Sequence, residues 1–88
     1  MTQNRVTSVS ETVLKELENL TGTNQVSKDL DIELFGEKLL DSLGTVELVI
    51  ALSEDFGLEL SPGDIDREKW ATPQKIINFI EERLASKS

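Results

Sequence analysis

The chain has 88 residues, of which 38% are hydrophobic, and a net charge of −8 at pH 7. A chain this short forms one domain that buries only about 60–65% of the surface exposed by its unfolded form, which excludes two domains and argues against a deep substrate pocket. The sequence contains no His and no Cys, so it lacks the commonest general base, the commonest metal ligand and the thiol nucleophile. We therefore expect a single domain over residues 1–88, ordered over about 8–84, that is not an enzyme.

The first predicted helix starts at Ser8 or Ser10, each a candidate N-cap, and ends at about Leu20. Gly22 and the small polar residues around it predict that end. The apolar residues of this segment recur at spacings of three and four, which is typical of an amphipathic helix, and they are Val6, Val9, Val13, Leu14, Leu17 and Leu20.

Residues 25–40 show no sustained period but are rich in large apolar side chains, so we expect a loop that packs on the core. Asp29, Asp31 and Glu33 suggest an EF-hand calcium loop. However, the sixth position of that loop is Leu34, where the tight turn needs Gly, and the twelfth is Leu40, where a bidentate Glu belongs. We therefore reject calcium binding there.

The second long helix is predicted from Asp41 or Ser42 to about Phe56, with Gly57 as its end. Its apolar stripe is wider than one packed face requires. The members of the stripe are Leu39, Leu43, Val46, Val49, Ile50, Leu52 and Phe56. The extra width makes three residues candidates for contact with a partner, although core packing is the simpler role for each: Leu43, Val46 and Ile50.

Residues 61–64 read as a turn, and Asp64 is expected to cap a short helix that runs through Lys69. Trp70 follows and is the single Trp of the chain. We expect it to anchor the small core rather than to form a binding platform.

The last predicted helix has Thr72 as N-cap and Pro73 at its first position, and it frays from Ala85 onward. Its predicted buried face consists of Ile76, Ile77, Ile80 and Leu84. The fold class is therefore all-α, a four-helix bundle with three longer helices, one short helix and a long first loop.

The first residues lack the apolar core of a signal peptide, and the longest aliphatic run, Leu48–Leu52, is too short to span a membrane. We expect a cytoplasmic monomer that does not insert into membranes and does not bind nucleic acid, because nucleic acid binding requires Lys and Arg to neutralise phosphates. Residues 39–66 carry −7 of the net charge, because they contain seven acids and neither Lys nor Arg. The acids are Asp41, Glu47, Glu54, Asp55, Glu59, Asp64 and Asp66. Such a segment either steers a basic partner or serves as a solvated face.

Ser42 lies where the loop joins the second long helix. Its hydroxyl is expected in the first turn, where unpaired N–H groups and the positive end of the helix dipole favour a phosphate on that oxygen. Asp and Ser are both preferred N-caps, so plain capping is the alternative role. Ser42 is not predicted to be a catalytic nucleophile, because the chain has no His and no Ser-x-x-Lys spacing starting there.

The segment Leu40-Asp41-Ser42-Leu43, followed by an acidic amphipathic helix in a small helical chain, resembles the acyl and peptidyl carrier protein family over roughly residues 8–84. Residues 35–48 and 66–73 are most similar to the D-alanyl carriers within that family. Gly44 and Ser53 set the chain apart from the fatty-acid carriers, which typically have an acid directly after the Ser-Leu pair and often another at the second position.

The resemblance implies that Ser42 receives 4′-phosphopantetheine from a phosphopantetheinyl transferase and that the charge of Asp41 aids this reaction. The arm's thiol then carries the cargo as a thioester, which an adenylating ligase loads and a downstream acyltransferase or synthase removes. The implied recognition face, whose members have a plain core or solvated role as the alternative, consists of Leu43, Val46, Glu47, Ile50 and Glu54.

The implied cargo is D-alanine for teichoic acid D-alanylation. Two alternatives remain open at this point. One is a free-standing carrier of a polyketide or nonribosomal peptide pathway. The other is a helical adaptor that binds a partner through its second long helix and uses Ser42 only as a cap.

Overall fold

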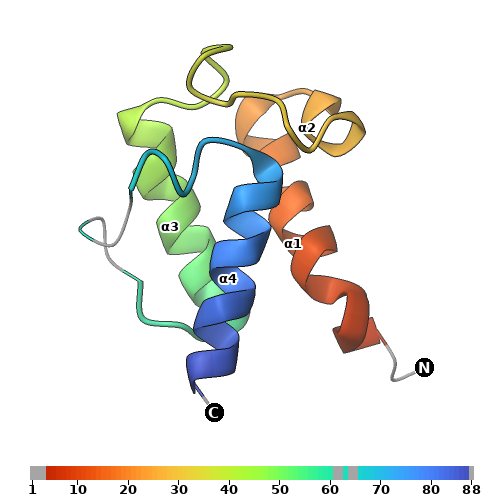
Figure 1. The fold of residues 1–88 in the computed structure, drawn as a ribbon, viewed down its shortest axis with the longest axis vertical. Coiled ribbons are helices and arrows are strands. Elements are labelled where there is room, and N and C mark those ends of the chain that lie inside the picture. Colours follow the sequence, from red (N-terminus) through yellow and green to blue (C-terminus); the bar gives the residue numbers. More distant parts are fainter. Residues whose placement is uncertain (1–3, 61–62, 64–65, 88) are drawn as a thin grey trace.

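The computed structural model describes residues 4–60, 63 and 66–87, with side chains for 9–60, 63 and 66–86. Its helices are α1 (Asn4–Thr21), α2 (Gln25–Lys28), α3 (Ser42–Phe56) and α4 (Pro73–Lys87), and these described ranges contain no strand. α1 runs toward one end of the molecule, and α3 and α4 both run back from that end (Figure 1). The predicted all-α architecture, with three longer helices, one short helix and a long first loop, is confirmed.

α1 packs against α2, α3 and α4 and so holds the bundle together. The prediction that it starts at Ser8 or Ser10 is wrong, because the helix already begins at Asn4. No Gly or Pro lies between residues 4 and 10 to interrupt it, and a Ser within a helix does not oblige the helix to start there. The predicted end is confirmed: Gly22 has a left-handed φ of 75°, and its N–H donates to the Glu18 carbonyl at 2.9 Å.

α3 and α4 have the starts that their capping residues predicted. Asp41 caps α3, and Gly57 ends it in the left-handed conformation, with φ 64°. The Thr72 hydroxyl accepts a hydrogen bond from the Lys75 N–H at 3.2 Å in front of α4. The predicted fraying from Ala85 is wrong, because α4 continues to Lys87, and nothing in this Ala- and Lys-containing end breaks a helix.

The short helix in the described part of the chain, α2, lies in the first loop, and residues 66–69 of the predicted short helix are not helical. Asp64, its expected cap, lies outside the described residues. The chain forms a turn that starts at Asp66. The Asp66 carboxylate accepts a hydrogen bond from the Glu68 N–H at 3.0 Å, and the Asp66 carbonyl accepts one from the Trp70 N–H at 3.0 Å. The Asp side chain thus satisfies the backbone within one turn and no helix develops over residues 66–70.

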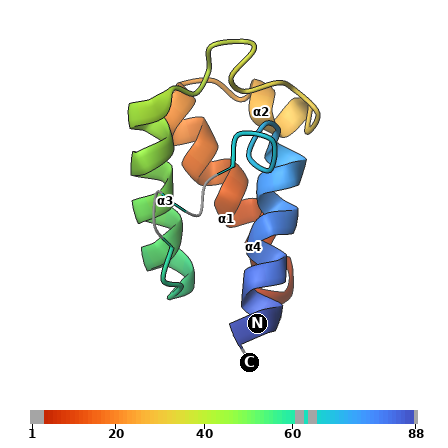
Figure 2. The same cartoon turned by 60° about the vertical axis from the view of Figure 1, so that its left-hand side comes forward.

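The first loop closes the end of the bundle at which α3 and α4 begin (Figure 1, Figure 2). Two backbone hydrogen bonds attach it to the start of α4 and to the segment before it: the Leu34 N–H donates to the Ala71 carbonyl at 2.8 Å, and the N–H of Gln74, in the first turn of α4, donates to the Leu30 carbonyl at 3.1 Å. The Arg67 guanidinium also lies over the aromatic ring of Phe35, a residue of the first loop, at 4.5 Å from the centre of the ring. The loop therefore packs on the core as predicted, and it leads into α3 from a fixed position.

The core draws side chains from every helix and from the loops. Its buried apolar members are Val13, Leu17, Val26, Leu34, Leu40, Leu48, Val49, Leu52, Leu58, Trp70, Ile76, Ile77, Phe79 and Ile80. Trp70 is fully buried and packs edge-to-face on Phe79 with ring centroids 5.4 Å apart, so its predicted role as an anchor is confirmed. Phe79 extends the buried face of α4 beyond the residues predicted for it.

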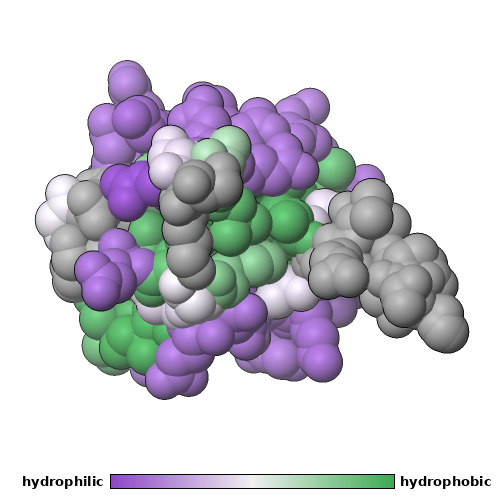
Figure 3. All heavy atoms as spheres, turned by 90° about the horizontal axis from the view of Figure 1, so that it is seen from below, coloured by the Kyte–Doolittle hydropathy of each residue, from purple (hydrophilic) through white to green (hydrophobic). Residues whose placement is uncertain are grey.

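Polar side chains cover much of the exterior. Seen from the end at which α3 and α4 finish, apolar residues gather in the middle of the surface and hydrophilic residues surround them (Figure 3). No helix in the described part of the chain combines the length and the apolar composition needed to cross a membrane.

Candidate functional site

Asp41 caps α3 and leaves the neighbouring Ser42 free of that task. Asp41 Oδ1 accepts a hydrogen bond from the Gly44 N–H at 2.7 Å. Its carbonyl oxygen accepts from the Thr45 N–H at 2.8 Å and from the Thr45 hydroxyl at 2.7 Å. Capping was expected of either Asp41 or Ser42, and the structure gives it to Asp41.

Ser42 is the first residue of α3, and its side chain is exposed. No hydrogen bond joins its hydroxyl to another of the described residues. The backbone N–H groups of Ser42 and Leu43 have no acceptor within the helix, because they belong to its first turn. An exposed hydroxyl beside free N–H groups and the positive end of a helix dipole suits esterification by a phosphate.

Gly44 gives Asp41 the space to form this cap. A Cβ atom at position 44 would lie 3.1 Å from Asp41 Oδ1 and 3.3 Å from Leu40 Cδ1, which is tighter than ordinary contact. The absence of a side chain at this position therefore has a local structural role, in addition to separating the sequence from the fatty-acid carriers.

The five residues of the implied recognition face lie at spacings of three and four, and hence on one side of α3. Leu43 is 69% exposed and Ile50 55% exposed, while Val46 is half-buried. Both acids of the set, Glu47 and Glu54, are exposed. The buried residues of α3 are Thr45, Leu48, Val49 and Leu52. Leu43 and Ile50 are therefore surface residues and not core residues, and acids lie between and beyond them.

A pocket of about 250 Å³ lies beside the start of α3, lined by Leu20, Lys38, Leu39, Asp41, Leu43, Gly44 and Glu47. Lys38 has a φ of 60° and is the one non-glycine residue with positive φ in the described part of the chain. Sequence reasoning missed this residue, because a Lys in a polar turn gives no signal of its backbone conformation.

A second pocket, of about 220 Å³, lies between α1 and α3, lined by Glu16, Asn19, Leu20, Glu47, Leu48 and Ala51. A side-chain hydrogen bond to Asp55, partial burial and the charge of Asp55 raise the pKa of Glu16 to about 7. The Glu16–Asp55 contact was also missed, because it joins two helices that are distant in the sequence.

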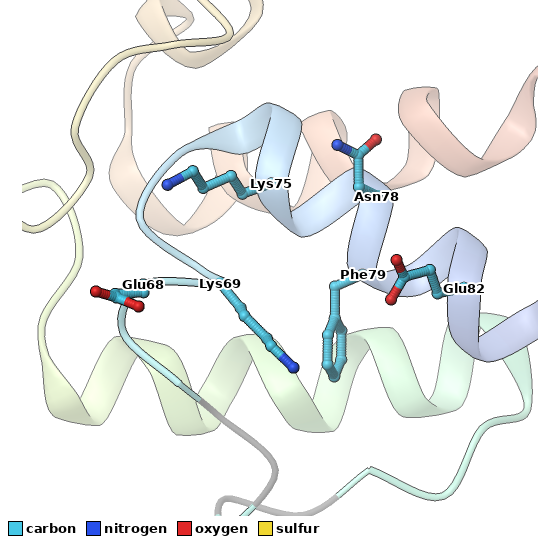
Figure 4. Close-up of a pocket in the computed structure, with 6 residues that line it drawn as sticks. All are labelled: Glu68, Lys69, Lys75, Asn78, Phe79 and Glu82. Carbon is cyan, nitrogen blue, oxygen red and sulfur yellow. The ribbon is translucent and has the colours of Figure 1, made fainter.

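The largest of these pockets, of about 330 Å³, lies between the turn before Trp70 and α4, lined by Glu68, Lys69, Lys75, Asn78, Phe79 and Glu82. The side chains of Lys69 and Phe79 both project toward α3 (Figure 4). None of the predicted site residues lines this pocket. Among the described residues, no group of three or more His, Cys, Asp or Glu side chains is placed to hold a metal ion.

Comparison with known proteins identifies the kind of site at Ser42. The family model described as "Phosphopantetheine attachment site" matches residues 11–80. The chain belongs to this family of phosphopantetheine-bearing carrier proteins. Like its relatives, the carrier takes up 4′-phosphopantetheine covalently, is not itself an enzyme, and works with a phosphopantetheinyl transferase and with the enzymes that load and unload it.

Several similar proteins carry one name. The carrier is 46% identical to the D-alanyl carrier protein of Enterococcus faecalis (strain ATCC 700802 / V583) over 74 residues, which cover 84% of this chain and 95% of the relative. It is 46% identical to the D-alanyl carrier protein of Lacticaseibacillus rhamnosus over 80% of this chain and 86% of the relative. It is 42% identical to that of Listeria monocytogenes serotype 4b (strain CLIP80459) over 81% of this chain and 91% of the relative.

Proposed function

We propose that Ser42 is the residue to which 4′-phosphopantetheine is attached, and that the loaded carrier transports D-alanine. The observation that supports this attachment site is that Asp41, and not Ser42, caps the start of α3. Asp41 satisfies the helix terminus through Gly44, while the Ser42 hydroxyl remains exposed and unengaged among the described residues. A serine used only as a cap would accept a backbone hydrogen bond two or three residues ahead.

The residues around Ser42 fit a phosphodiester on its oxygen. The free N–H groups of the first turn and the helix dipole stabilise negative charge there. Asp41 is held through both its carboxylate and its carbonyl oxygen, so Ser42 projects from a rigid position. When bound, the group supplies the terminal thiol that this Cys-free chain lacks.

D-alanine is the proposed cargo because the similar proteins are D-alanyl carrier proteins that align with most of this chain. The acceptor implied by the resemblance is teichoic acid. We place the carrier in the cytoplasm, where the coenzyme A used by a transferase and the ATP used by an adenylating ligase are available.

The exposed side of α3 is proposed to bind these partner enzymes. Leu43 and Ile50 supply apolar contact, Val46 lies between them, and the flanking Glu47 and Glu54 attract Lys or Arg on a partner. A carrier must dissociate after each transfer, and a small apolar patch with charged neighbours suits a weak, rapidly reversible interface.

The attachment site is tested by incubating the apo protein with coenzyme A and a broad-specificity phosphopantetheinyl transferase, followed by intact-mass measurement. We expect one adduct on the wild-type protein and none on Ser42→Ala. Ser53→Ala, which changes another serine of α3, is the matched control and should be modified like the wild type. An unmodified wild type would favour the helical adaptor, and an adduct that persists in Ser42→Ala would place the attachment elsewhere.

The cargo is tested separately with the holo protein and its adenylating ligase. We expect D-alanine to be loaded in preference to L-alanine, glycine and other amino acids. Efficient loading of another acid would instead indicate a carrier of a peptide or polyketide pathway, and it would leave the assignment of Ser42 intact.

A further inference from the structure

Lys38 occupies a backbone conformation that disfavours its side chain. Its φ of 60° lies in the left-handed region, where a Cβ atom crowds the following carbonyl oxygen. The fold imposes this conformation: the N–H groups of Leu39 and Leu40 both donate to the Leu34 carbonyl, at 2.8 and 3.0 Å, and Leu34 and Leu40 are buried. Gly would be free of this crowding, so a Lys here raises the question of what the ammonium group contributes.

The position of Lys38 points to the start of α3. It lines the same pocket as Asp41 and Leu43, the two neighbours of Ser42. Its side chain is exposed, and no carboxylate of the described residues forms an ion pair with it. It is also the last base before a long acidic stretch, because the sequence contains no Lys or Arg between Lys38 and Arg67.

We propose that the Lys38 ammonium binds the phosphodiester that joins the 4′-phosphopantetheine arm to Ser42; this inference rests on the proposed attachment at that residue. A phosphodiester on the Ser42 oxygen would add negative charge beside a pocket that already holds Asp41 and Glu47. A long, flexible Lys stem on the wall of that pocket can bring a compact positive charge to the phosphate oxygens. The helix N–H groups and Lys38 would then contact the phosphate from two sides.

Comparison of apo and holo forms tests this role without any partner enzyme. Attachment of the arm should raise the melting temperature of the wild type, relative to its own apo form, by about 2–4 °C more than that of Lys38→Gln at low salt. This difference should shrink in high salt, because the pair is screened. Lys38→Arg should retain most of the gain, and the ³¹P resonance of the arm should differ between the wild type and Lys38→Gln.

Lys38→Gly separates charge from backbone strain. Its apo form should melt at a higher temperature than the wild-type apo form, because Gly adopts this φ freely, but it should lose the additional gain on attachment. Lys75→Gln, which removes an exposed Lys from α4, is the matched control and should behave like the wild type.

Two results would overturn the proposal. Equal holo-minus-apo shifts in the wild type and Lys38→Gln would show that Lys38 does not bind the phosphate, and an equal loss in Lys75→Gln would show only a general charge effect. In both cases the mass adduct on Ser42 would persist, so the attachment site would stand. A wild type that acquires no adduct would instead overturn the attachment site and this inference together.

Discussion

Glu16 of α1 and Asp55 of α3 are joined by a hydrogen bond between their carboxyl groups, which raises the pKa of Glu16 to about 7. The bond requires one of the two groups to hold a proton. The Glu16 side chain binds a proton more tightly in the folded protein than in the unfolded chain, where its pKa is about 4.5. The native state therefore binds more protons between these two values, and the free energy of unfolding falls as the pH rises from about 4.5 to about 7.

Glu16→Gln should remove this pH dependence. The Gln amide can donate to Asp55 at every pH, so the variant should melt about 2–4 °C above the wild type at pH 8 and close to it at pH 5. The effect is small because the pair is largely exposed and screened by solvent. Thermal unfolding followed by circular dichroism at several pH values measures it. Glu11→Gln, an exposed acid on the same helix, is the control, and an equal gain in both variants at pH 8 would indicate a general charge effect.

The division of roles between Asp41 and Ser42 predicts opposite outcomes for two adjacent alanine substitutions. Asp41→Ala should lower the free energy of unfolding by about 1 kcal/mol, because the Gly44 N–H loses its acceptor. Ser42→Ala should change it by less than about 0.5 kcal/mol, as is usual for an exposed residue outside a cap. Urea unfolding of the apo proteins distinguishes the two. A larger loss for Ser42→Ala would show that its hydroxyl supports the helix.

The charge of Glu47 should accelerate loading by the adenylating ligase. Glu47→Lys reverses an exposed charge beside the apolar patch, and we expect a several-fold lower kcat/KM at low salt that approaches the wild-type value at high salt. Glu81→Lys makes the same charge change on α4 and should have the smaller effect. If the rates for Glu47→Lys match the wild type at every ionic strength, Glu47 does not face the ligase.

Alanine substitutions at two adjacent residues of α3, the buried Val49 and the exposed Ile50, should distinguish an effect on stability from an effect on partner binding. Ile50→Ala shortens an exposed side chain and replaces a β-branched residue by a better helix former. It should leave the melting temperature unchanged or slightly higher and reduce kcat/KM for loading. Val49→Ala, at a buried position, should lower the free energy of unfolding by about 1–3 kcal/mol and load normally while folded. Normal loading of Ile50→Ala would remove Ile50 from the interface.

Features fixed by a few neighbouring residues were predictable from the sequence. The starts of α3 and α4 follow from Asp41 and from Thr72 with Pro73, and Gly22 and Gly57 mark helix ends. Each signal acts within about four residues, so no tertiary information was needed.

Other features were not predictable, because they are too short, share their sequence signal with another structure, or depend on distant contacts. α2 is only four residues long, too short to show a helical period, and its one buried side chain is Val26. Asp66 was not recognised as the centre of a turn, because a capped helix and an Asp-stabilised turn share the same first residues. The left-handed φ of Lys38 depends on the burial of Leu34 and Leu40 on either side of it.

At the candidate site, the sequence placed the recognition residues on α3 but left their exposure open. The helical period tells which residues share a side, and it does not tell which side the rest of the protein covers. The packing of α1 against α3 decides this, leaving Leu43 and Ile50 in solvent.

The two hydrogen bonds that join the first loop to Ala71 and to Gln74 connect parts of the chain that are distant in the sequence. The Leu34 N–H donates to Ala71 and the Leu30 carbonyl accepts from Gln74, and the ribosome adds these two partners some forty residues later. The loop that leads into Ser42 therefore cannot complete its native hydrogen bonds on a nascent chain that stops before residue 74. A transferase that recognises the folded loop therefore requires a nascent chain that extends at least to residue 74.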